Sequence, residues 1–144
     1  MSVRYKVILD LLVCVILMFV HSNAACWTYH NSTPTSFEVY SVDFSPDGAY
    51  LAMAEKSKGV TLLRTSDYTT VSSYSAHYTS DYANSVKYSS DQSMIAIGGI
   101  SSSGAYIEIL QSPTLSMKIN ILTGFKIIAE IDFNQDGTRI IACG

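Results

Sequence analysis

Residues 42–54 read VDFSPDGAYLAMA, and the pattern returns as VKYSSDQSMIAIG at residues 86–98 and as IDFNQDGTRIIAC at residues 131–143. Each copy is centred on an aspartate, and the spacings are 44 and 45 residues: Asp47, Asp91 and Asp136. Self-similarity at a fixed period of about 20 to 50 residues is typical of repeat architectures. The sequence therefore predicts one supersecondary unit that is repeated along the chain.

Each copy has the pattern of two strands joined by a tight turn. Apolar and polar residues alternate before the turn, as a sheet with two different faces requires. In the first and third copies an aspartate that can accept backbone hydrogen bonds precedes a glycine that tolerates positive φ, namely Gly48 and Gly137. The middle copy has Gln92 in place of the glycine, so its turn is expected to be strained or of another type. The residues after each turn are apolar on both faces, which predicts a buried strand.

Two further strands fit between successive copies. Residues 59–64 and 105–110 have the pattern of third strands, and residues 70–74 and 116–121 that of fourth strands. No segment after the N-terminal apolar run shows a period of 3.6 residues. The sequence therefore predicts an all-β chain with four strands in each repeat.

A repeat of this length, with V-x-F-S-P-D-G before a small and apolar strand, resembles the WD-repeat β-propeller family. The resemblance implies four-stranded antiparallel blades near residues 37–81 and 82–125 and a partial blade at 126–144. Because a ring needs at least about four blades, the implied fold is a partial β-propeller.

The resemblance is degenerate at two places in each repeat. Ala76-His77 and Gly124-Phe125 stand where the family has Gly-His, and Arg64-Thr65 and Gln111-Ser112 stand where it has Trp-Asp. The buried hydrogen-bond tetrad of such blades therefore lacks partners, and looser blades are expected. His77 either braces its blade from inside or lies in solvent.

The N-terminus has the order of a secretory signal peptide. Arg4 and Lys6 precede an apolar run at 7–20, and small residues follow up to Ala24. We expect a signal peptide at 1–24, a polar segment at 25–36 and blades at 37–144, with a secreted or lumenal location. The alternative is a membrane anchor formed by residues 7–20.

Two predicted modifications follow from the secretory route. Cys26 and Cys143 are the cysteines that remain after removal of the leader, and they either form a disulfide or stay unpaired. Asn31 begins the sequence Asn-Ser-Thr in a polar stretch, so it is a possible N-glycosylation site.

Composition and motifs exclude several classes of function. The net charge of -3 and the charged fraction of 15% fit neither a nucleic-acid-binding arm nor a disordered acidic tail. Asp132 begins the sequence D-x-N-x-D-G of a calcium loop, but the twelfth position, which needs a glutamate, holds Cys143. We therefore expect turn-forming aspartates, no metal and no cofactor.

The predicted function is a non-catalytic protein-interaction module. Its candidate binding loop joins two blades and is rich in tyrosine: Tyr74, His77, Tyr78 and Tyr82. Tyrosines in a loop supply rigid contact area, although they could equally cover a blade edge. A hydrolase or oxidoreductase is disfavoured because the inner-strand positions hold mainly serine, threonine and aliphatic residues.

The alternative function is structural. The blades would assemble with copies of the chain or with a separately encoded remainder, because a partial propeller leaves open blade edges. The expected partner is therefore a protein or the chain itself, and a membrane only if the leader is retained.

Overall fold

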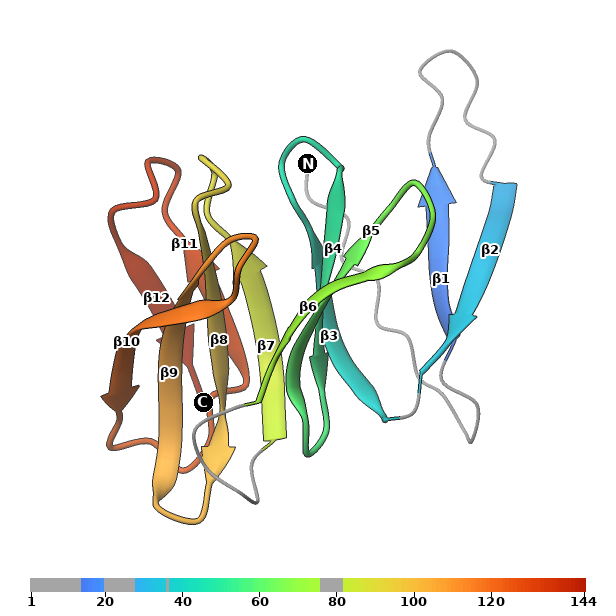
Figure 1. The fold of residues 1–144 in the computed structure, drawn as a ribbon. Coiled ribbons are helices and arrows are strands. Elements are labelled where there is room, and N and C mark those ends of the chain that lie inside the picture. The colour runs from blue at the N-terminus through green and yellow to red at the C-terminus, as the bar shows by residue number, and fades with distance from the viewer. Residues whose placement is uncertain (1–13, 20–27, 36, 76–81) are drawn as a thin grey trace. The chain divides into compact units, whose positions relative to one another are not determined.

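The computed structural model describes residues 14–19, 28–35, 37–75 and 82–144 (Figure 1). The contacts between residues divide the chain into two units, residues 1–38 and residues 39–144. Each unit is described by itself below.

The larger unit contains two four-stranded antiparallel sheets and one two-stranded sheet. The first blade consists of β3 (Val39–Phe44), β4 (Tyr50–Glu55), β5 (Gly59–Arg64) and β6 (Thr70–Tyr74). The second blade consists of β7 (Tyr82–Tyr88), β8 (Met94–Ser101), β9 (Gly104–Gln111) and β10 (Ser116–Leu122). The half-blade consists of β11 (Glu130–Phe133) and β12 (Ile140–Cys143). The predicted all-β fold of four-stranded antiparallel blades is confirmed.

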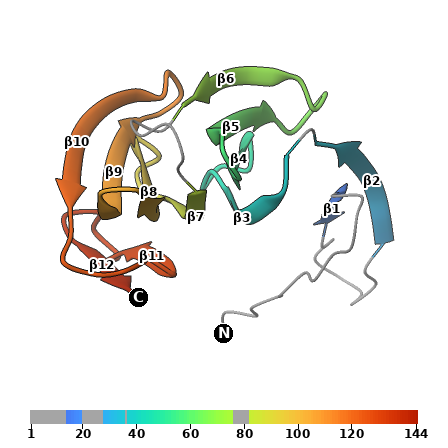
Figure 2. The ribbon, with the colours of Figure 1, turned by 90° about the horizontal axis from the view of Figure 1, so that it is seen from below.

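Within residues 39–144, the first strands of successive repeats lie side by side. β3 contacts β7, and β7 contacts β11, whereas the fourth strands β6 and β10 lie at the outside (Figure 2). A backbone N–H of each later strand donates to a serine hydroxyl of the earlier one: Val86 to Ser41 at 3.3 Å and Ile131 to Ser85 at 3.1 Å. The repeat of the sequence is therefore also a repeat of the joint between neighbouring sheets.

Apolar residues from the facing sides of the sheets fill these joints. Ala52, Ala54 and Leu62 of the first blade belong to one buried cluster with Val86 and Tyr88 of the second blade. A second cluster joins the second blade to the half-blade and contains Ala96, Ile109, Ile128 and Ile131. The strands β4 and β8, predicted from the sequence to be apolar on both faces, supply buried residues to these two clusters.

The three tight turns share one backbone conformation. Gly48 has φ of 73° and Gly137 has φ of 70°, and Gln92 has φ of 66°. The middle turn is therefore not of a different type, and the prediction that it is strained holds. A non-glycine residue in the left-handed region costs on the order of 1–2 kcal/mol, because its Cβ approaches the following carbonyl oxygen.

A buried carboxylate contact joins the third and fourth strands of the second blade. Glu108 on β9 is fully buried, and Asn120 on β10 donates its Nδ2 hydrogen to Glu108 Oε1 at 2.8 Å. Tyr74 on β6 of the first blade lies near Glu108. The sequence predicted looser blades from the missing tetrad, and it missed the Glu108–Asn120 contact because the two residues lie 12 positions apart on different strands.

The smaller unit contains one antiparallel hairpin. β1 (Cys14–Phe19) pairs with β2 (Thr28–Pro34), with Cys14 opposite Pro34 and Phe19 opposite Thr28. No helix in the described ranges is long and apolar enough to cross a membrane. The rest of the predicted leader, residues 1–13 and 20–24, lies outside the described residues, so its cleavage and the secretory location stay predictions.

Candidate functional site

The structure separates the residues of the predicted binding loop. His77 and Tyr78 belong to residues 76–81, which lie outside the described ranges. Tyr74 ends β6 and Tyr82 begins β7, and the two tyrosines have different surroundings.

Tyr74 lies in the joint between the two blades. Its hydroxyl donates to Met117 Sδ of β10 at 3.4 Å, and its side chain packs against the buried cluster of that joint. Burial, together with the nearby charge of Glu108, raises the pKa of Tyr74 above its ordinary value. Tyr74 therefore joins two blades, and its predicted contact with a partner stays a prediction.

Tyr82 belongs to an exposed cluster with Tyr40 of β3 and Lys56, which we call the tyrosine–lysine cluster. The ring centroids of Tyr40 and Tyr82 are 6.3 Å apart and the rings are tilted by 54°. Lys56 Nζ lies 5.7 Å from the Tyr82 ring centroid, and Lys56 forms an antiparallel bridge with Tyr82. Both tyrosine side chains remain exposed. An ammonium group at this distance from an aromatic face is attracted by the ring quadrupole.

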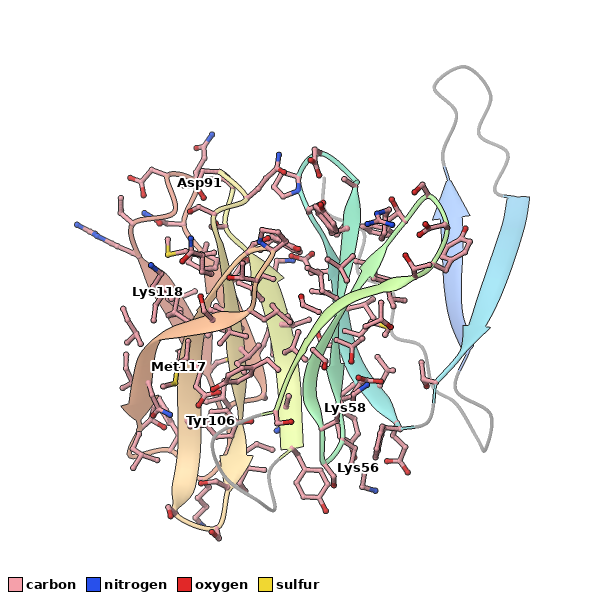
Figure 3. All side chains as sticks on the ribbon, viewed as in Figure 1. Lys56, Lys58, Asp91, Tyr106, Met117 and Lys118 are labelled. Atoms are coloured by element: carbon pink, nitrogen blue, oxygen red, sulfur yellow. The ribbon has the colours of Figure 1, made fainter. Side chains whose placement is uncertain are left out.

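Sequence reasoning missed Tyr40 and Lys56 because it considered only the loop from the fourth to the first strand. The available signal was the antiparallel order, since the start of β3 and the turn after β4 must lie at the same end of one sheet. Figure 3 shows Lys56 and Lys58 together at this end, with Asp91 at the opposite end.

A buried carboxylate holds Lys58 beside this cluster. Lys58 Nζ lies 3.2 Å from Glu55 Oε2, and the Thr61 hydroxyl donates to the same carboxylate oxygen. The Glu55 side chain is almost fully buried, so the end of the first blade is fixed by this contact. Lys56 thus places an ammonium group beside two exposed tyrosines, whereas the charge of the neighbouring Lys58 is paired with Glu55.

The three turn aspartates each cap their own turn. Each carboxylate accepts a backbone N–H two residues later, from Ala49 at 2.9 Å, Ser93 at 3.0 Å and Thr138 at 2.9 Å. Hydroxyl donors lower the pKa of each carboxyl below its ordinary value, chiefly Ser45 for Asp47, Ser89 for Asp91 and Thr138 for Asp136. These contacts engage Oδ1 of each aspartate within its own turn.

Among the described residues, no group of three or more histidine, cysteine, aspartate or glutamate side chains could hold a metal ion. Asp132 accepts the backbone N–H of Phe133 at 2.8 Å. Asp47, Asp132 and Asp136 therefore make local backbone contacts.

The first strands carry more charge than the sequence reading allowed. Asp43, Lys87 and Asp132 occupy one equivalent position on β3, β7 and β11, so the description of these positions as mainly serine, threonine and aliphatic is wrong. Lys87 Nζ lies 3.2 Å from Asp43 Oδ1, and Asp43 Oδ2 accepts the Tyr88 N–H at 2.8 Å. Desolvation raises the pKa of Asp43, and the Tyr88 N–H and Lys87 oppose this shift. These contacts join two blades.

The structure describes Asn31 and only one of the two cysteines of the predicted disulfide. Cys143 is an exposed, unpaired cysteine at the end of β12, and Cys26 lies outside the described residues. Asn31 lies on β2, opposite Leu17 of β1. The disulfide and the glycan stay predictions.

Comparison with known proteins points to one family. The family described as "WD domain, G-beta repeat" (WD40) matches residues 24–60. This match includes residues 24–36, which the sequence reading had left outside the blades. No curated protein matches the chain at a significant level.

Two similar solved structures are described as "Crystal structure of RRP9 WD40 repeats", with a TM-score of 0.66, and "Structure of U3-55K", with a TM-score of 0.65. Each is 12% identical to the chain, over 75% of this chain and 33% of the other. The chain therefore spans about a third of the length of these two chains. It resembles the WD-repeat family in sequence at residues 24–60 and has the WD40 propeller-blade fold over three quarters of its length.

Proposed function

We propose that the chain is a non-catalytic protein-interaction module that binds a protein partner through the tyrosine–lysine cluster. The observation that carries the proposal is the group of exposed Tyr40 and Tyr82 with half-buried Lys56, drawn from two blades to one end of the sheets. Propellers of the WD-repeat kind generally serve as protein-interaction modules, which supports this class of function.

The chemistry of the cluster indicates the kind of partner segment. Tyrosine rings offer rigid apolar area with few rotatable bonds, and aromatic residues are enriched at the centres of interfaces. Lys56 and Lys58 attract negative charge. The partner segment therefore carries an apolar or aromatic residue next to an aspartate or glutamate.

The test compares charge reversal inside and outside the cluster. Lys56→Glu and Tyr82→Ser variants are used as bait beside the wild-type chain, and the recovered proteins are quantified by mass spectrometry. Lys118→Glu is the matched control, because Lys118 is an exposed lysine on the outer strand β10.

We expect a partner that the wild-type chain and Lys118→Glu recover equally and that Lys56→Glu loses at least tenfold. The affinity of the wild-type chain for this partner should fall with rising salt, because salt screens the charge of Lys56. Equal recovery by all variants would remove the cluster as the binding surface.

A further inference from the structure

A bulge in the outer strand β10 determines which way the side chain of Met117 faces (Figure 3). Met117 pairs with Leu110 of β9, and the register shifts before Ile119, which pairs with Ile109. Residues that pair across antiparallel strands point to the same face of the sheet. Leu110 belongs to the buried cluster between the first two blades, whereas Ile109 belongs to the cluster of the half-blade. Met117 therefore lies on the face of β10 that is turned toward the first blade.

Met117 differs from the other methionines of residues 39–144 in its exposure. Its side chain is 44% exposed, whereas Met53 is 2% exposed and Met94 packs against the half-blade cluster. An oxidant dissolved in water attacks a thioether sulfur most readily where the side chain meets the solvent. Met117 is therefore the methionine of this unit that such an oxidant reaches first.

The sulfur of Met117 takes part in the contact between the two blades. The Tyr74 hydroxyl of β6 donates to Met117 Sδ at 3.4 Å. Ser72, two residues earlier on β6, donates to the carbonyl oxygen of Pro113 in the turn before β10 at 2.7 Å. These hydrogen bonds join β6 of the first blade to the β9–β10 hairpin of the second. A thioether sulfur is a weak acceptor, so the Tyr74 bond is the weaker of the two.

Oxidation replaces this weak acceptor by a strong one. The oxygen atom of a sulfoxide is polar, and it accepts a hydrogen bond from a hydroxyl as a carbonyl oxygen does. The Tyr74 hydroxyl already lies beside the sulfur, and it keeps its proton because burial raises its pKa. Because Met117 is partly in solvent, the polar group does not have to enter the apolar core.

We propose that Met117 is an oxidation site at which a hydroperoxide strengthens the contact between the first two blades. The sulfur attacks one oxygen of hydrogen peroxide, the O–O bond breaks and an S–O bond forms. The proton of the transferred oxygen passes to the departing hydroxide, which leaves as water. The sulfur loses the two electrons that the peroxide gains. The sulfoxide oxygen then accepts the hydrogen of the Tyr74 hydroxyl in place of the sulfur.

The direction of this effect is opposite to that at a buried methionine, where a sulfoxide disrupts the packing. The modification is also reversible, because methionine sulfoxide reductases return the sulfoxide to the thioether. The joint between the blades thus responds to an oxidant and recovers from it. This goes beyond the proposed partner binding, since neither Met117 nor Tyr74 belongs to the tyrosine–lysine cluster.

The first measurement locates the oxidised residue. The full chain, with its cysteines blocked by iodoacetamide, is treated with dilute hydrogen peroxide, and each added oxygen atom is located by peptide mass spectrometry. We expect Met117 to be oxidised at least about tenfold faster than Met53, because only Met117 is exposed. Equal rates at the two methionines would overturn the proposal.

The second measurement is the thermal midpoint before and after oxidation, for the wild-type chain and two variants. We expect the wild-type midpoint to rise by about 2 °C or more, because a stronger hydrogen bond joins the blades. Tyr74→Phe keeps the ring and removes the donor, so its midpoint should stay constant or fall. Met117→Leu keeps an apolar side chain without sulfur, so it reports the effect of oxidation at other residues.

A wild-type midpoint that falls or stays constant on oxidation would overturn the proposal, and so would an equal rise in Tyr74→Phe or in Met117→Leu. Methionine sulfoxide reductase should return the oxidised wild-type chain to its original midpoint. Neither measurement involves a partner protein. A failure of this proposal is therefore distinguishable from a failure of partner binding through the tyrosine–lysine cluster, which the Lys56→Glu and Lys118→Glu variants test.

Discussion

The joint between the first two blades and the open face of β12 are built from equivalent residues, yet they differ in burial. In the joint, Ala52 lies against the second blade, and Asp43 pairs with Lys87. On the open face, Ile141 and Asp132 hold the same repeat positions without a following sheet among the described residues. A sequence repeat thus encodes a potential contact, and the position of a blade in the row decides whether that contact is made.

The largest expected effect comes from placing a charge at the two equivalent positions, Ala52 in the joint and Ile141 on the open face. Ala52→Lys inserts a long ammonium side chain into a fully buried position and should cost about 4 kcal/mol or more of unfolding free energy. Ile141→Lys changes a side chain that is 73% exposed and should cost less than about 1 kcal/mol. Urea denaturation measures both losses, and equal losses would contradict the difference in burial between the two positions.

The next effect concerns the polar contact of the same joint. Asp43→Ala leaves the Tyr88 N–H without its acceptor and Lys87 without its partner, which should cost on the order of 2 kcal/mol. Asp43→Asn keeps an acceptor for Tyr88, and the lost ion pair is partly screened by solvent, so its cost should stay below about 1 kcal/mol. Similar losses of unfolding free energy in Asp43→Ala and Asp43→Asn would show that the charge of Asp43 makes the main contribution to stability.

The raised pKa of Asp43 adds a pH dependence with a definite sign. The folded state binds the proton more readily than the unfolded state, so burial of this carboxyl costs stability as the pH rises from about 3.8 through the raised pKa. Lowering the pH from about 7 to about 4 should therefore favour the wild-type chain relative to Asp43→Asn. Urea denaturation at both pH values measures the stability difference between the wild-type chain and Asp43→Asn. A difference that does not change with pH would contradict the raised pKa of Asp43.

A smaller effect compares the turns at the end of each joint. Gln92→Gly removes the left-handed strain of a non-glycine residue and should stabilise the chain by up to about 1 kcal/mol, while Gly48→Ala should destabilise it by about 1 kcal/mol. The thermal midpoint measures both changes. A lower thermal midpoint of Gln92→Gly would show that the Gln92 side chain stabilises the chain by more than its backbone strain destabilises it.

The smallest expected effect is a pKa change in the first turn. Ser45→Ala removes the hydroxyl that contributes most to the lowered pKa of Asp47, so this pKa should rise toward about 3.8. A lowered pKa in the folded state stabilises the chain above the unfolded value, and this stability is lost as the pH falls through the folded value. NMR titration of the Asp47 carboxyl measures the change, and the pKa of Asp91 should stay constant as the internal control.

The strands and turns of the repeat were predictable because their signals are local. The third strand at 59–64 and the fourth strand at 70–74 have the predicted bounds, since glycine and polar residues mark their ends. The conformation of Gln92 was only half predicted, because sequence shows the strain but not that the surrounding hairpin enforces the same turn.

The contacts between sheets were not predictable in the same way. The group of Tyr40, Lys56 and Tyr82 joins residues of two blades, and the Glu108–Asn120 contact joins two strands, so neither leaves a pattern along the chain. The apolar run that includes Cys14–Phe19 fits both a leader and a β-strand, because apolar content alone does not separate the two.

Pull-down with the Lys56→Glu and Lys118→Glu variants tests the central claim most directly, because each variant reverses one lysine charge and only Lys56 belongs to the tyrosine–lysine cluster. The account predicts that Lys118→Glu recovers the partner as the wild-type chain does and that Lys56→Glu loses it. Equal recovery of the partner by the two variants would contradict the account.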